Sequence, residues 1–319
     1  MRRTKLAIVV SVALAIAVAG CGGSGKSTSS GKVGRGGIYR LADPSFYLTG
    51  GFDPTSEYVY QAWEIDGGML LRTLMSYRHV AGIDGTQVLP DLATSMPTIS
   101  DSGRTYTFTL KPGVKFGPPV NRVVTSKDIA YAFERMGSAS EGAQYAFYYY
   151  IIKGFTVHNG PPSPISGIQT PNDRTIVFHL TQPAGDFLAR LTLPSTAPIP
   201  EEVAMCFPNA GDYGRYVISS GPYMLLGSDK LNISSCKTMK PIAGADPSQR
   251  FSFVRNPNYD PKTDNPTIRE SLINGLVWTI DPNIQDIFNR IQANDLDGTT
   301  VPPPGKVIQQ YATSSSLRV

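Results

Sequence analysis

Residues 103–116 read GRTYTFTLKPGVKF, and residues 125–135 read TSKDIAYAFER. In the first segment the apolar residues Tyr106, Phe108 and Leu110 alternate with threonines. Because successive side chains of a strand point to opposite faces, this alternation predicts a β-strand with one buried face. The second segment follows after a loop and has a different period.

That second segment has the signature of an amphipathic helix. Thr125 is a good N-cap, and Asp128 stands at the third helical position, where its carboxylate can accept a hydrogen bond from the N-cap. The apolar residues at helical spacing are Ile129, Ala132, Phe133 and Met136. These four residues would form the buried face of the helix.

The flanking segments extend the pattern in both directions. We expect a strand at 37–41, a helix within 58–75 that Gly67-Gly68 weakens, and a strand carrying Ile176, Phe178 and Leu180. Beyond Pro194 we expect strands at 223–226, 251–255 and 276–280 and a helix at 282–294. This order predicts an α+β section followed by an α/β section.

The N-terminus resembles a lipoprotein export signal. Basic residues precede an apolar run of 14 residues, Leu6 to Ala19, which is shorter than the roughly 20 residues that a membrane-spanning helix needs. Small residues then precede Cys21, so we expect cleavage after residue 20 and lipid attachment at Cys21. The alternative is an ordinary cleaved signal followed by a chance cysteine.

A flexible linker is expected at 21–35, because its Gly, Ser, Lys and Thr residues offer little apolar surface to bury. Residues 20–27, GCGGSGKS, match the phosphate-loop pattern. Nucleotide binding is not expected there, since the pattern needs a strand before it and a helix after it, and cleavage would remove Gly20.

Charge and cysteine content fit an exported protein. Removal of residues 1–20, which hold three basic and no acidic residues, would leave 26 Lys+Arg against 25 Asp+Glu. No basic run of the kind that binds nucleic acid remains. In an oxidising compartment we expect Cys206 and Cys236 to form a disulfide, with two free buried thiols as the alternative.

Catalytic patterns are scarce, and we expect no enzyme, no cofactor and no metal site. The three histidines, His79, His158 and His179, stand far apart and outside metal-binding motifs. Residues 234–237 match S-x-x-K but lie in a loop-like segment without the later K-T-G. Aromatic residues are more prominent, notably Tyr145 to Tyr150, which suits either a ligand cleft or a buried helix stripe.

Several separated blocks of sequence, taken in order, resemble family 5 solute-binding proteins, the oligopeptide, dipeptide and nickel receptors of ABC importers. They are FDP at 52–54, LPDLA at 89–93, the two segments at 103–116 and 125–135, SGPY at 220–223, RNPNY at 255–259 and ANDLD at 293–297. The loop GPPVNR at 117–122 and Asp260 depart from the family pattern, in which an acidic Asp-Gly turn and a tryptophan are usual.

The resemblance implies a periplasmic-binding-protein type II fold of the peptide-binding subclass, α/β with an inserted α+β subdomain. The ranges would be a signal at 1–20, a linker at 21–35, domain I at 36–59 and 194–297, the insert at 60–193, and the start of a third lobe at 298–319. We therefore expect a chain truncated relative to the family, with the third lobe largely missing.

The resemblance also implies a site and a function. Tyr58 and Tyr60 match the loop that lines the peptide backbone, Tyr145 falls near an aromatic contact of the insert, and Ser220-Gly221 form the turn under the ligand. A lipid-anchored receptor of this family would capture a peptide outside the cytoplasmic membrane and deliver it to an ABC permease. A dipeptide, a longer peptide, a metal chelate or a sugar remain possible ligands. A structural or signalling lipoprotein and an exported hydrolase are the alternative functions.

Overall fold

The computed structural model describes residues 34–46, 48, 49 and 51–313. The expected export signal, Cys21 and the phosphate-loop pattern at 20–27 therefore lie outside the described residues.

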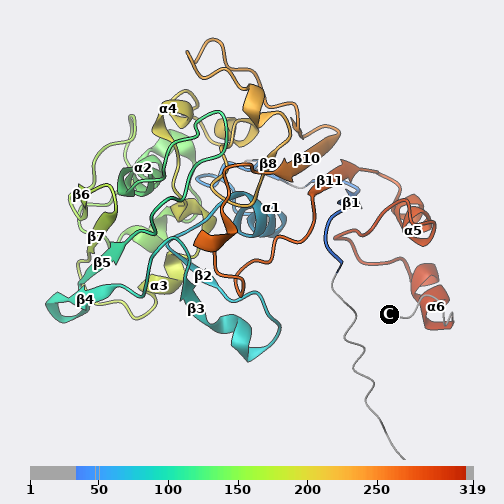
Figure 1. The fold of residues 1–319 in the computed structure, drawn as a ribbon, viewed down its shortest axis with the longest axis horizontal. Coiled ribbons are helices and arrows are strands. Elements are labelled where there is room, and N and C mark those ends of the chain that lie inside the picture. Colours follow the sequence, from blue (N-terminus) through green and yellow to red (C-terminus); the bar gives the residue numbers. More distant parts are fainter. Residues whose placement is uncertain (1–33, 47, 50, 314–319) are drawn as a thin grey trace, which may run out of the picture. The chain divides into compact units, whose positions relative to one another are not determined.

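One sheet joins the beginning of the described chain to its last third. Its strands run in the order β1 (Ile38–Asp43), β11 (Gly275–Ile280), β10 (Arg250–Arg255) and β8 (Tyr223–Leu225), and β9 (Ala245–Asp246) also pairs with β10. β1 and β11 are parallel, and the other pairs are antiparallel. Figure 1 shows β1 in blue beside the orange strands from the far end of the sequence.

A second sheet comes from the middle of the chain and is wholly antiparallel. Its order is β4 (Thr98–Ser100), β5 (Thr105–Thr109), β7 (Thr175–His179) and β6 (Ile168–Asn172). The predicted face of the opening segment is confirmed, since Tyr106, Phe108 and Leu110 are all at most 5% exposed. Helix α2 (Ser126–Gly137) packs against this sheet (Figure 1).

The predicted start of α2 is also confirmed. The backbone N–H and the hydroxyl of Thr125 both donate to one carboxylate oxygen of Asp128, at 2.7 and 2.9 Å. The four residues of the expected apolar face, Ile129, Ala132, Phe133 and Met136, are at most 1% exposed. The capping residues therefore begin the helix where its apolar face meets the core.

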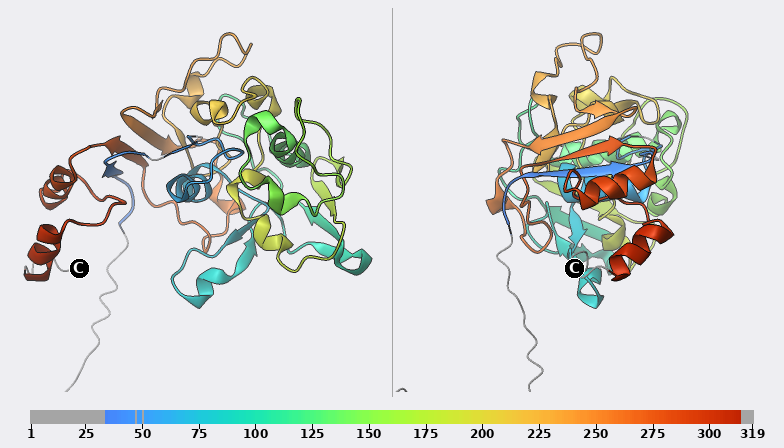
Figure 2. Two further views of the ribbon diagram at one scale, coloured as in Figure 1. Left: turned by 180° about the vertical axis from the view of Figure 1, so that it is seen from behind. Right: turned by 90° about the vertical axis from the view of Figure 1, so that its right-hand side faces the viewer.

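The other elements are short. They are α1 (Tyr60–Ile65), which continues into a π-helical turn (Asp66–Leu70), the hairpin β2 (Met75–Tyr77) and β3 (Val88–Pro90), and the helices α3 (Phe187–Arg190), α4 (Glu201–Ala204), α5 (Ile284–Gln292) and α6 (Gly305–Thr313). In Figure 2, α5 and α6, drawn in red, follow the strands of the first sheet. Among the described residues, the structure contains no helix with the length and apolarity needed to cross a bilayer.

The expected helix within 58–75 is wrong for its last part. Leu71 has an extended backbone, with φ −123° and ψ 155°, and Met75 begins β2. The apolar residues after Leu70 keep a helical spacing, but they are buried as an extended segment because β2 pairs with β3.

Two large apolar cores and one small cluster of Ala42, Ile287 and Leu296 stabilise the described part of the chain. The first lies on the β1–β11–β10–β8 sheet, where Phe46, Phe52, Phe251 and Trp278 pack with ring centroids 4.7 to 6.5 Å apart. The second lies between α2 and the sheet of β4, β5, β7 and β6, and its buried residues all fall between Leu74 and Leu191. The first core also takes residues from 62–132, so the domain boundaries at 59/60 and 193/194 stay a prediction.

Cys206 and Cys236 form a disulfide, the pairing that the compartment argument favoured over two free thiols. It closes a segment with a sequence separation of 30 between the two cysteines. Ser234 lies within this segment and Lys237 directly after it, and the cysteine between them in the S-x-x-K pattern, Cys236, is one end of the disulfide.

Candidate functional site

Two buried acidic residues, Asp53 and Glu57, accept hydrogen bonds from the backbone of the loop that precedes α1. Asp53, which is fully buried, accepts a hydrogen bond from Thr55 N–H and stands 3.3 Å from the guanidinium of Arg135. The carboxylate of Glu57, 2% exposed, accepts the backbone N–H groups of Tyr58 and Val59, each at 2.7 Å. These bonds fix the backbone of the loop while the Tyr58 side chain stays 44% exposed.

Helix α1 adds two aromatic residues, the exposed Tyr60 and the half-buried Trp63. Tyr60 begins the helix and is 69% exposed. Trp63 follows three residues later, and residues at this spacing share one helix face. The indole N–H of Trp63 donates to the backbone carbonyl of Glu57 at 3.1 Å, which ties the ring back to the loop.

The third part of the site is the turn that contains Tyr145, Phe147 and Tyr148. Ring centroids of Trp63 and Tyr145 lie 4.9 Å apart, those of Tyr145 and Tyr148 lie 5.6 Å apart in a stacked pair, and those of Phe147 and Tyr148 lie 4.4 Å apart. We call these four residues, Trp63, Tyr145, Phe147 and Tyr148, the aromatic cluster. It joins α1 to a segment some 80 residues further along the chain, which the sequence alone did not place beside it.

The turn at 219–223 braces the far end of α1 and its π-helical extension. The N–H groups of Ser220 and Gly221 both donate to the carbonyl of Leu70, at 3.0 and 2.8 Å. A methyl group added at Gly221 would stand 2.5 Å from the carbonyl oxygen of Met69, so only glycine allows this close approach. Ser220 and Gly221 are thus buried supports of the site, and a direct contact with ligand through them stays an expectation.

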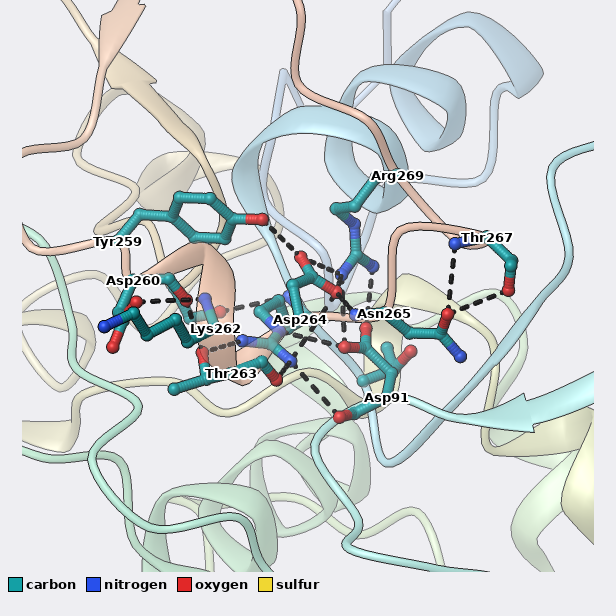
Figure 3. A network of polar contacts seen from close by, with 12 residues as sticks. Asp91, Tyr259, Asp260, Lys262, Thr263, Asp264, Asn265, Thr267 and Arg269 are labelled. Carbon is teal, nitrogen blue, oxygen red and sulfur yellow. Dashed lines mark hydrogen bonds and ion pairs between the residues drawn. The ribbon is translucent and has the colours of Figure 1, made fainter.

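A buried ionic network continues this support, and Figure 3 shows Asp91, Asp264 and Arg269 of this network. Arg72, whose N–H donates to the Ser220 hydroxyl, also donates to Asp91 at 2.8 Å. Arg269 reaches Asp91 at 2.7 Å and Asp264 at 3.1 Å. We call Arg72, Asp91, Asp264 and Arg269 the ionic clasp; their side chains are at most 3% exposed. Burial opposes ionisation of Asp91, but Arg269 and Arg72 together hold its pKa below the usual value.

Two carboxyl groups near the site are shifted in the opposite direction. Burial, and then the neighbouring carboxylates of Glu57 and Asp53, raise the pKa of Asp66 well above its usual value. Among the described residues no hydrogen-bond partner reaches either carboxylate oxygen of Asp66. Burial also raises the pKa of Glu141 to about 7, although Arg135 forms an ion pair with it. The base of the site therefore contains two acidic groups whose burial weakens their ionisation.

The structure separates the predicted site residues into two sets. It places Tyr58 and Tyr60 on the loop and helix beside Trp63, brings Tyr145 against Trp63, and buries Ser220 and Gly221 below. The expectation of a buried stripe at 145–150 holds only for Tyr149, which is fully buried, whereas Phe147 and Tyr150 are 54% and 53% exposed.

Two parts of the site were not predicted from the sequence: Trp63 within the aromatic cluster, and the pair Asp186 and Arg190 beside it. Arg190 donates to Asp186 at 2.8 to 3.1 Å and lies 5.9 Å from the ring centroid of Tyr148. An acidic and a basic residue four positions apart are the pattern of a helical ion pair, and this spacing was the available signal.

The candidate catalytic residues do not converge in the described part of the chain. His179 contacts Thr105 at 3.2 Å, and His158 contacts Ser163 at 2.9 Å, so each forms a local polar pair. Ser234 contacts Thr238 in an exposed loop. Within the described ranges no three His, Cys, Asp or Glu side chains are grouped so that they could hold a metal ion.

Comparisons with known proteins agree with this architecture. Residues 87–317 match the model of the bacterial extracellular solute-binding proteins, family 5. Protein XP55 of Streptomyces lividans is 28% identical over 68% of this chain and 32% of its own length. The dipeptide-binding protein of Escherichia coli strain K12 is 26% identical over 83% of this chain and 45% of its own length.

A solved structure, that of the clavulanic acid biosynthesis oligopeptide binding protein 2, matches 89% of this chain and 48% of its own length. Its TM-score is 0.74 and its identity 27%. The chain thus spans between about a third and a half of the length of the proteins it resembles. Since the family model matches most of the sequence, this chain belongs to the bacterial extracellular solute-binding proteins of family 5.

Proposed function

We propose that this chain supplies one wall of a peptide-binding cleft in a substrate-binding lipoprotein of an ABC importer. The observation that carries the proposal is the aromatic surface formed by Tyr58, Tyr60 and the aromatic cluster, in which Tyr58, Tyr60 and Phe147 are exposed and the other rings are half-buried. Aromatic rings with polar edges offer contact area at a small entropic cost, which suits a flexible ligand. The relatives named for dipeptides and oligopeptides favour peptides over other solutes.

Binding would work by enclosure and without bond making. A peptide would lie against the aromatic surface, a further lobe would close over it, and the closed form would dock on the permease. The expected ranges, with domain I at 36–59 and 194–297 and the insert at 60–193, are part of this proposal. Lipid attachment at Cys21 would keep the protein at the outer face of the cytoplasmic membrane.

Calorimetric titration with alanine tripeptide tests the binding role. A peptide at one hundred times its Kd should raise the unfolding free energy by about 2.7 kcal/mol. Tyr145→Ala should weaken binding at least about tenfold, because its ring contacts Trp63 and Tyr148. Tyr77→Ala is the matched control, since Tyr77 is 37% exposed on β2 and belongs to no part of the site. Absence of peptide binding by the unaltered chain would contradict the proposal.

The anchor is tested separately by mass spectrometry of the protein from its membrane fraction. The expected result is a diacylglycerol on Cys21, lost together with membrane association in Cys21→Ser. Recovery of unaltered protein in the soluble fraction would contradict the lipoprotein part of the proposal alone.

A further inference from the structure

A pocket of about 270 Å³ opens beside the aromatic cluster. It is lined by Trp63, Tyr145, Tyr148, Asp186, Ala189, Arg190 and Leu193. Three of these residues are aromatic and two more are aliphatic, so most of the wall is apolar. Pockets that take whole small-molecule ligands usually measure roughly 300–1,000 Å³, so this one suits a single group of a larger ligand.

The two charged residues of the wall neutralise each other. Arg190 donates through Nε and Nη2 to the carboxylate of Asp186, at 2.8 to 3.1 Å, and through Nη1 to the carbonyl of Tyr148. Every arm of the guanidinium is therefore used within the protein. A bound ion would have to compete with this bidentate pair, so the pocket offers little to a free charge.

The rings of the wall fix what the pocket can recognise. Trp63 is tilted by 52° against Tyr145, and Tyr145 is stacked on Tyr148 with 12° between the planes. Another ring entering the pocket beside them could make the offset or edge contacts that aromatic pairs prefer, with centroids roughly 4.5–7 Å apart. The guanidinium over Tyr148 adds a flat surface on which such a ring can stack.

We infer that this pocket is a subsite for one aromatic side chain of the bound peptide, so that the receptor prefers peptides that contain phenylalanine, tyrosine or tryptophan. The inference rests on the proposed function, because it takes peptides as the ligand. It adds a side-chain preference that the exposed aromatic surface alone does not require.

Tryptophan fluorescence gives a direct measurement of this subsite. The chain has two tryptophans, and Trp278 is buried in the first core at 1% exposure. In the Trp278→Phe variant, Trp63 is the remaining tryptophan and reports on the pocket. We would titrate it with alanine tripeptide, with the three tripeptides that carry one phenylalanine, and with the three that carry one lysine. Calorimetry on the unaltered chain gives the same affinity ratios if that variant does not fold.

At least one phenylalanine peptide should bind about 10- to 100-fold more tightly than alanine tripeptide, with a change in Trp63 emission, because burial of the ring contributes on that scale. Ala189→Phe should fill the pocket and bring this ratio close to one. Gln182→Phe adds the same side chain at an exposed position outside the pocket and should leave the ratio as it was.

The other outcomes would overturn the inference. Equal affinity for phenylalanine and alanine peptides, or an unchanged ratio in Ala189→Phe, would remove the aromatic subsite and leave the proposed function standing. Tighter binding of the lysine peptides would replace it with a cation site at Asp186. Binding of none of the peptides would overturn both this inference and the proposed function.

Discussion

Asp91→Asn removes one negative charge from the ionic clasp, in which two arginines face two aspartates. Asp91 is fully buried and accepts from Arg72 at 2.8 Å and from Arg269 at 2.7 and 3.1 Å. In the variant, both guanidinium groups would share Asp264 alone. Breaking a buried ion pair by removing one partner typically costs about 3–5 kcal/mol, because a buried charge is left uncompensated.

The effect has a defined pH dependence. The folded-state pKa of Asp91 lies below its unfolded value of 3.8, so its contribution to stability is present above about pH 4 and is lost as pH falls below that value. The difference in stability between the unaltered chain and Asp91→Asn should therefore be largest near pH 7 and should shrink towards pH 3.

Urea unfolding followed by circular dichroism at pH 7 and pH 3 measures both effects. Asp101→Asn is the control, since Asp101 pairs with Arg104 on the surface, where both side chains are about half exposed. An exposed pair contributes about 0–1 kcal/mol, so this variant should barely change the midpoint. If Asp91→Asn lowers the unfolding free energy at pH 7 by less than about 1 kcal/mol, the assignment of the ionic clasp as a support of α1 is refuted.

Three further predictions concern other parts of the fold. The raised pKa of Asp66 means that its contribution to stability is present below about pH 4 and declines as pH rises. Asp66→Asn should therefore flatten the fall of the unfolding free energy, measured by urea unfolding, between pH 5 and pH 8, by at most about 1.4 kcal/mol per pH unit. An unchanged slope would refute this. Gly221→Ala should cost about 1–3 kcal/mol through the contact with the Met69 carbonyl, whereas Gly185→Ala, which meets open space, should not destabilise the fold; equal melting temperatures would show that the turn is not tight. Reduction of the Cys206–Cys236 disulfide should cost about 3–4 kcal/mol for a loop of this length, as a lower thermal midpoint, and an unaffected midpoint would mean that the loop contributes no constraint.

The sequence predicted those helices and strands whose own residues alternate or repeat so as to form one buried face. Alternation at 105–110 and the capping residues of α2 are local signals, and the structure confirms both. Strand β4 could not be predicted in this way, because its three residues are all exposed and it forms only by pairing with β5. The parallel pairing of β1 with β11 joins segments more than 230 residues apart, which no periodicity encodes.

The candidate site was predicted only in part, for a similar reason. Aromatic residues near 58–60 and 145 were visible in the sequence, but their contact through Trp63 depends on how two distant segments fold together. The ionic clasp was harder still to predict. Charged residues are usually solvated, so Arg72 and Arg269 gave no sign that they would be buried.

Hydrogen–deuterium exchange of the full chain, with and without alanine tripeptide, tests the central claim most directly. If the aromatic surface is one wall of the peptide cleft, the peptide should slow exchange of the amides in 57–63 and 145–148, and leave those of the disulfide-closed segment 207–235 unchanged. Saturating peptide that protects neither segment of the aromatic surface, or protects 207–235 instead, would contradict the account.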